Sequence, residues 1–136
     1  MPPMLMKNDQ DPRKVIYDKI GLTTDLKIPG FQLLGNRVMV GVYERPSITK
    51  SGIHLADVSR QEDLHQGKAG LVVALGPTAF VSDDHFQFGD EDKLKIGDWC
   101  MLFVSYGLRC VVNGQVCRII RDQDITMKIP APDQVW

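Results

Sequence analysis

Residues 37–75, RVMVGVYERPSITKSGIHLADVSRQEDLHQGKAGLVVAL, are the stretch that decides the fold. Its two ends, Arg37–Tyr43 and Ala69–Leu75, are rich in valine and leucine and predict β-strands. The segment between them, Glu44–Lys68, is polar and is much longer than an ordinary connection within a compact domain. We therefore expect it to be either a functional loop or a disordered one.

The two predicted strands differ in their pattern. Val38, Val40 and Val42 alternate with other residues, which is the period-2 pattern of a strand with one buried face. Ala69–Leu75 is apolar at both odd and even positions, which indicates burial on both faces.

One apolar island lies in the middle of the polar segment, at Ser51-Gly52-Ile53-His54-Leu55. In an extended chain Ile53 and Leu55 project to the same side, and Gly52 gives flexibility before them. This arrangement is typical of a strand-like peptide that docks in the groove of a partner.

Composition limits the classes of function. A chain of 136 residues suits one domain. Its 16 Lys and Arg against 17 Asp and Glu, a net charge of -1, provide no electrostatic reason to expect nucleic acid or a membrane as a partner. No apolar run is long enough to span a bilayer, and the first residues do not resemble a signal peptide. Three cysteines without a C-x-x-C suit a reducing compartment, so we expect a soluble, cytoplasmic protein.

A short helix is predicted before the β-rich region. Asp11 is a suitable N-cap, Pro12 suits the first helical position and Gly21 suits a left-handed stop. A helix this short forms only if an apolar face packs on something, either its own domain or a neighbouring molecule. The residues expected to dock are Val15, Ile16 and Ile20.

The remaining elements are short and separated by turn signals. We expect strands at Asp98–Val104 and Met127–Ile129, an acidic irregular region at Thr78–Lys95, and a two-residue hairpin turn at Asn113-Gly114. This pattern predicts a small all-β barrel or sandwich with antiparallel strands.

Counting outward from the hairpin turn places Cys110 opposite Cys117 and Arg109 opposite Arg118. The cysteine pair fits either a disulfide or two buried free thiols. The arginine pair implies like-charge repulsion unless both side chains point outward or a bulge shifts the register.

We find no constellation typical of an enzyme. The P-loop, H-E-x-x-H and G-x-S-x-G patterns are all absent from the sequence. His54, His65 and His85 fall among polar residues in predicted loops, and the acidic residues lack the spacing of a calcium loop. We therefore expect no catalytic activity, metal or cofactor.

Five segments follow, in order, the sequence patterns of the GroES co-chaperonins, also known as the 10 kDa chaperonin family. The segments are Leu34–Val40 (LGNRVMV), Ser51–Leu55 (SGIHL), Gln66–Pro77 (QGKAGLVVALGP), Leu94–Cys100 (LKIGDWC) and Arg121–Ile125 (RDQDI). The chain from residue 31 to residue 129 therefore resembles GroES.

This resemblance implies an irregular antiparallel β-barrel at residues 31–129 that assembles into a homo-heptameric ring. Terminal strands of neighbouring subunits would pair with each other. The subunit-interface residues implied in this way are Phe31, Leu33, Met127 and Ile129.

The resemblance also implies a partner, a GroEL-type chaperonin, which the ring would cap to assist protein folding. The contact would be made by a mobile loop that is disordered when free and orders on the chaperonin. The contact residues implied here are Gly52, Ile53, His54 and Leu55.

The chain departs from the family pattern at several places. His54 occupies a position where the family has an aliphatic residue, and the acidic Ser82–Asp92 segment replaces a hairpin. The N-terminal arm, residues 1–30, and the C-terminal tail, residues 130–136, are additions. These additions suggest a divergent, phage-encoded relative, for which the alternative function is a virion structural protein such as a capsid decoration or connector protein.

Overall fold

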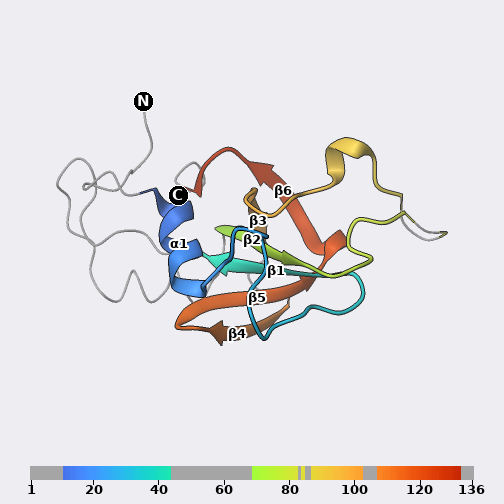
Figure 1. Ribbon diagram of the computed structural model, residues 1–136. Helices are drawn as coiled ribbons and strands as arrows, with labels where there is room; N and C mark the ends of the chain where they lie inside the picture. Colours follow the sequence, from blue (N-terminus) through green and yellow to red (C-terminus); the bar gives the residue numbers. More distant parts are fainter. Residues whose placement is uncertain (1–10, 44–68, 83, 85–86, 103–106, 133–136) are drawn as a thin grey trace, which may run out of the picture.

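The computed structural model describes residues 11–43, 69–82, 84, 87–102 and 107–132 (Figure 1). One α-helix precedes six β-strands, and two single-turn 3-10 helices lie between strands. In chain order the elements are α1 (Pro12–Ile20), β1 (Arg37–Val42), β2 (Ala69–Leu75), η1 (Asp90–Asp92), β3 (Trp99–Leu102), β4 (Leu108–Val112), β5 (Gln115–Arg121), η2 (Asp122–Asp124) and β6 (Ile125–Ile129).

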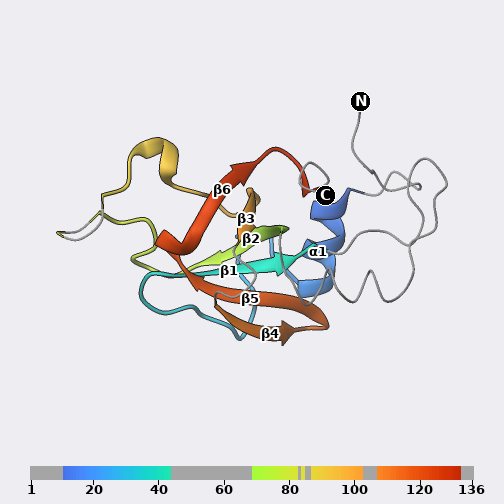
Figure 2. The ribbon, with the colours of Figure 1, turned by 180° about the vertical axis from the view of Figure 1, so that it is seen from behind.

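The strands form one sheet in the order β4-β5-β1-β2-β3-β6, and every neighbouring pair is antiparallel. The predicted all-β, antiparallel class is confirmed. Closure into a barrel is not observed within the described residues, because the edge strands β4 and β6 do not pair with each other. Segments outside the strands cover the two faces of the sheet instead (Figures 1 and 2).

The sheet has a hydrophobic cluster on each face. On one face α1 and the segment that follows it pack over Met39, Leu71 and Trp99. On the other face Phe80 and Leu94, from the connection between β2 and β3, join a cluster with Val38, Val40, Val72, Cys100, Leu102 and Ile120. Burial on both faces of β2 is thus confirmed.

The expectation of a single buried face for β1 was wrong. Val38 and Val40 belong to one cluster and Met39 belongs to the other, and all three are buried. The reason is tertiary, since β1 lies between β2 and β5 at the centre of the sheet and both of its faces are covered.

The predicted helix forms as α1. The Asp11 carboxylate accepts a hydrogen bond from the Arg13 backbone nitrogen at 3.0 Å, and Gly21 ends the helix in the left-handed conformation with φ of 78°. Ile16 and Ile20, one helical turn apart, are buried in the core, whereas Val15 is 38% exposed and lies outside that stripe.

The helix packs on its own domain. A Cβ atom added at Gly41 of β1 would lie 2.7 Å from Ile16 Cγ2, so the glycine permits the close approach of helix and strand. At the other end of α1, Asn113 Nδ2 of the β4–β5 hairpin donates to the Ile20 carbonyl oxygen at 2.7 Å. The helix is therefore held by two different parts of the sheet.

Two strand boundaries differ from the predicted ones. β3 begins at Trp99 and ends at Leu102, and residues 103–106 lie outside the described part of the chain. β6 begins at Ile125, two residues early, because Ile125 already pairs with Leu102 across an irregularity in the register.

The predicted hairpin is confirmed. Asn113 and Gly114 have positive φ angles, 52° and 84°, and no irregularity interrupts the pairing of β4 with β5. Arg109 lies opposite Arg118, as counted from the turn. Arg118 does not point outward to solvent but is buried. Its burial, together with the nearby charge of Arg109, lowers the pKa of Arg118 from the usual value.

A buried carboxylate, Asp122, joins three segments that are distant in the sequence. It accepts hydrogen bonds from the Phe80 backbone nitrogen at 2.9 Å, from Asn36 Nδ2 at 3.2 Å and from the Gln123 backbone nitrogen at 2.8 Å. Its own backbone nitrogen donates to the Asn36 carbonyl oxygen. Asp122 therefore ties the turn before β1 and the connection after β2 to the end of β5.

Replacing this carboxylate should weaken the fold measurably. Asp122→Ala leaves buried donors without an acceptor, and we expect the free energy of unfolding to fall by about 2–3 kcal/mol in urea titrations. Asp124→Ala is the matched control, because Asp124 forms an ion pair with Arg121 near the surface and its loss should cost about 0–1 kcal/mol. Equal losses in the two variants would contradict the role assigned to Asp122.

Contact between α1 and β1 can be tested with a double-mutant cycle. Gly41→Ala should cost about 1–3 kcal/mol by overpacking, and Ile16→Ala about 2–5 kcal/mol by leaving a cavity. The Ile16 side chain occupies the space that a Cβ atom at position 41 would need. The double variant should therefore lose less unfolding free energy than the two single variants lose when their losses are added. Val15→Ala combined with Gly41→Ala should be additive, and additivity in both cycles would contradict the packing described above.

Candidate functional site: partner-binding surfaces

The residues proposed to contact a chaperonin, Gly52, Ile53, His54 and Leu55, lie outside the described residues. The structure does describe the two strands from which segment 44–68 leaves the sheet. β1 and β2 are antiparallel neighbours, and the Tyr43 backbone nitrogen donates to the Ala69 carbonyl oxygen at 2.9 Å. This hydrogen bond closes the base of the segment. We call this base, where Tyr43 and Ala69 meet at the ends of β1 and β2, the stem.

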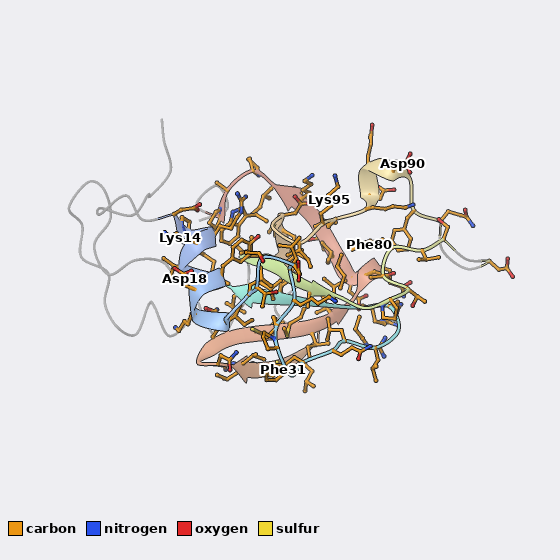
Figure 3. All side chains as sticks on the ribbon, viewed as in Figure 1. Lys14, Asp18, Phe31, Phe80, Asp90 and Lys95 are labelled. Carbon is orange, nitrogen blue, oxygen red and sulfur yellow. The ribbon has the colours of Figure 1, made fainter. Side chains whose placement is uncertain are left out.

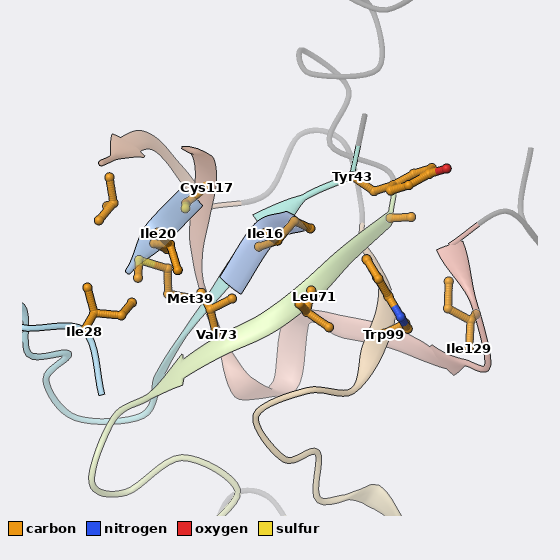
Figure 4. Packing of buried hydrophobic residues seen from close by; sticks show 12 residues of the cluster. Ile16, Ile20, Ile28, Met39, Tyr43, Leu71, Val73, Trp99, Cys117 and Ile129 are labelled. Atoms are coloured by element: carbon orange, nitrogen blue, oxygen red, sulfur yellow. The ribbon is translucent and has the colours of Figure 1, made fainter. Parts of the chain in front are cut away.

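Core contacts hold the stem in place (Figure 4). The rings of Tyr43 and Trp99 meet edge to face with centroids 5.9 Å apart, and both side chains are buried. Gln115 Nε2 donates to the Val42 carbonyl oxygen at 3.0 Å. Since aromatic pairs and buried hydrogen bonds of this kind restrict motion, both ends of segment 44–68 are attached to a fixed base.

The stem and the acidic region lie at opposite ends of the sheet. Figures 1 and 2 show α1 beside the stem at one end and η1 at the other, and Figure 3 shows Asp90 at that far end. Asp90, Glu91 and Asp92 are exposed, and Asp90 lies 3.9 Å from the Lys93 ammonium. Their solvent exposure is typical of a solvated charged face.

The four predicted subunit-interface residues differ in their accessibility. Phe31 and Met127 are 52% and 48% exposed, whereas Leu33 is partly buried and Ile129 is buried in the core. Ile129 and Met127 pair with Trp99 and Met101 of the same chain. One side of β6 thus pairs within the subunit, and its other side forms an edge of the sheet in the part of the chain that the structure describes.

A groove of about 800 Å³ lies between the segment 26–33 and the sheet. Its lining is mostly apolar and includes Phe31 and Leu33 on one wall and Cys110 and Val111 of the edge strand β4 on the other. In Figure 3 Phe31 lies on the β4 side of the molecule. Sequence reasoning missed this groove, because it exists only where the 26–33 segment folds back over strands that come much later in the chain.

Neither a metal-binding cluster nor a membrane-spanning helix is found in the part of the chain that the structure describes. No three His, Cys, Asp or Glu side chains there gather into a group that could hold a metal ion. Within the same residues, no helix combines the length and hydrophobicity needed to cross a membrane.

Comparison with known proteins identifies the family. The family described as "Chaperonin 10 Kd subunit" matches residues 30–129, which is most of the chain. A co-chaperonin GroES of Methanosarcina mazei is 31% identical over 81 residues, which are 54% of this chain and 84% of that protein. A co-chaperonin GroES of Acetivibrio thermocellus is 30% identical over 92 residues, 68% of this chain and 89% of that protein. With the stem and both of its strands inside the matched region, the chain belongs to the chaperonin 10 kDa subunit family, the GroES-like co-chaperonins.

Proposed function

We propose that this protein is a co-chaperonin that caps a GroEL-type chaperonin in the cytoplasm and binds it through segment 44–68. The observation that carries the proposal is the family match over residues 30–129, which includes the segment and both strands of its stem. The two relatives described above are themselves named co-chaperonin GroES. The proposed activity is the binding of a chaperonin.

The stem supports this role physically. Because Tyr43 and Ala69 are joined by a hydrogen bond and packed in the core, the ends of the segment are anchored at one end of the sheet. Ile53 and Leu55 then serve as the apolar anchors of the contact. Ordering a segment on binding costs conformational entropy, so each copy binds weakly, and a ring of copies provides the avidity.

His54 distinguishes this chain from its family pattern. A polar imidazole between the two apolar anchors offers less hydrophobic burial than an aliphatic residue would. We propose that the contact per subunit is weaker in this protein than in relatives with three apolar residues, and that Gly52 allows the backbone to adapt.

For the ring we propose heptameric assembly through strand addition. Among the described strands β6 is an edge strand, so its outer side can pair with a neighbouring chain, and Met127 is exposed on that strand. The neighbour would contribute residues 31–34, where Phe31 is exposed and Leu33 faces the groove. Ile129 would act indirectly, by holding β6 on β3.

The virion structural role has no observation that favours it over this proposal. In that role the N-terminal arm would grip a neighbouring molecule. In the described structure the helix of that arm is packed on its own sheet, with Ile16 against Gly41 and Ile20 in the core.

Charge in place of the apolar anchors should abolish chaperonin binding. The combined Ile53→Asp and Leu55→Asp variant loses two buried side chains, each worth about 1.5–3 kcal/mol, so we expect binding to weaken by roughly a hundredfold or more. The measurement is complex formation with purified GroEL and nucleotide in sedimentation velocity. Val58→Asp, in the same segment but outside the tripeptide, should bind normally. Unchanged binding by the double variant would contradict the proposed contact.

Ring assembly can be tested separately at β6. Met127→Glu should shift the native mass spectrum from the heptamer to smaller species, because a carboxylate at the interface loses its hydration. Val81→Glu is the matched control, since Val81 is similarly exposed at 55% but lies on the β2–β3 connection. Dissociation of both variants, or of neither, would contradict the interface at β6.

A further inference from the structure

Two thiols lie side by side on neighbouring strands, and one of them, Cys110, lines the groove. Cys110 of β4 and Cys117 of β5 are directly paired in the register of the hairpin. Their side chains are on the same face of the sheet, because directly opposed residues of an antiparallel pair point to the same side. Both belong to the helix-side cluster, Cys117 as a buried member and Cys110 as a partly buried one.

The pairing geometry suits a covalent bridge. Val112 and Gln115 flank the two-residue turn as a hydrogen-bonded pair, and the pattern alternates, so the cysteines occupy the next hydrogen-bonded pair. Such pairs have Cα atoms about 5.5 Å apart, within the range that disulfides accept. Both cysteines are free thiols in the structure.

Access differs between the two sulfurs. Cys110 is partly exposed and lines the groove, which opens to solvent, whereas Cys117 is buried behind it and its thiol donates to the Gln115 carbonyl oxygen at 3.4 Å. An oxidant that enters the groove therefore meets Cys110 first and Cys117 only through Cys110.

We propose that Cys110 and Cys117 form a redox-active dithiol that a small-molecule disulfide converts into a cross-strand disulfide. The Cys110 thiolate attacks one sulfur of the reagent, which forms a mixed disulfide and releases one thiolate. The Cys117 thiolate then attacks the Cys110 sulfur, and the second reagent thiolate leaves. The protein dithiol loses two electrons, the reagent gains them, and the two thiol protons end on the two released reagent thiols.

Burial makes this reaction slow at neutral pH. Desolvation raises the pKa of Cys110, and it raises the pKa of Cys117 to about 12, with a further contribution from the neighbouring Cys110. Since the thiolate is the nucleophile, we expect bridge formation over hours rather than seconds, and faster in mildly alkaline buffer. The third cysteine, Cys100, is buried in the opposite cluster on β3 and should remain reduced.

A cleavage experiment distinguishes the bridge from other oxidation products. Asn113-Gly114 is the single Asn-Gly bond in the chain and lies between the two cysteines, so hydroxylamine cuts the hairpin at its turn. The full-length protein is incubated with oxidised glutathione, remaining thiols are alkylated, and the unfolded chain is cleaved. We expect residues 1–113 and 114–136 to stay joined on a non-reducing gel and to separate after addition of reductant.

Three variants complete the test. Cys110→Ser and Cys117→Ser should each give separate fragments, and Cys100→Ser should behave like the unchanged protein. Circular dichroism before oxidation confirms that each variant is folded. Separate fragments from the unchanged protein, a stable glutathione adduct on Cys110, or a bridge that requires Cys100 would each overturn the proposal.

Discussion

The central position of β1 is the constraint on which the rest of the structure depends. β1 pairs with β2 on one side and with β5 on the other, so it has no free edge. Its buried side chains point alternately to two faces, and both faces must therefore be covered by other parts of the chain. The helix α1 covers one face and the β2–β3 connection covers the other, although neither belongs to the sheet.

This constraint explains why the helix α1 is a structural part of the domain. Gly41 lacks a side chain where Ile16 approaches, and Asn113 binds the last carbonyl group of α1. The Gly41 contact connects the helix to the central strand that leads into the stem at Tyr43, and the Asn113 hydrogen bond connects it to the β4–β5 hairpin. An N-terminal helix that could have served a neighbour instead stabilises the base from which segment 44–68 leaves the sheet.

The surfaces proposed for function are spread around this framework and differ in rigidity. The stem has buried aromatic and hydrogen-bonded contacts, and β6 is paired along one side with β3. The groove, by contrast, is walled on one side by residues 26–33, which are outside any helix or strand and include Leu26 with a positive φ angle. Cys110 lies on the other wall of that groove and Cys117 is buried behind it, so the geometry of the dithiol is set by the hairpin register rather than by the loop.

Much of the fold and of the family assignment could be derived from the sequence, because those features have local causes. The cap at Asp11, the stop at Gly21 and the turn at Asn113-Gly114 depend on the conformational preferences of single residues, and the Cys110–Cys117 pairing follows from the turn by counting. The apolar pattern of Ile53 and Leu55 likewise needs no structure to be recognised.

Tertiary structure alone decided four other features. These are the burial on both faces of β1, the exposure of Val15, the buried position of the Asp122 carboxylate and the groove. Each of these depends on which distant segment lies against a residue, as Phe80 and Asn36 lie against Asp122, and the chain encodes such contacts only through the packing of the whole domain.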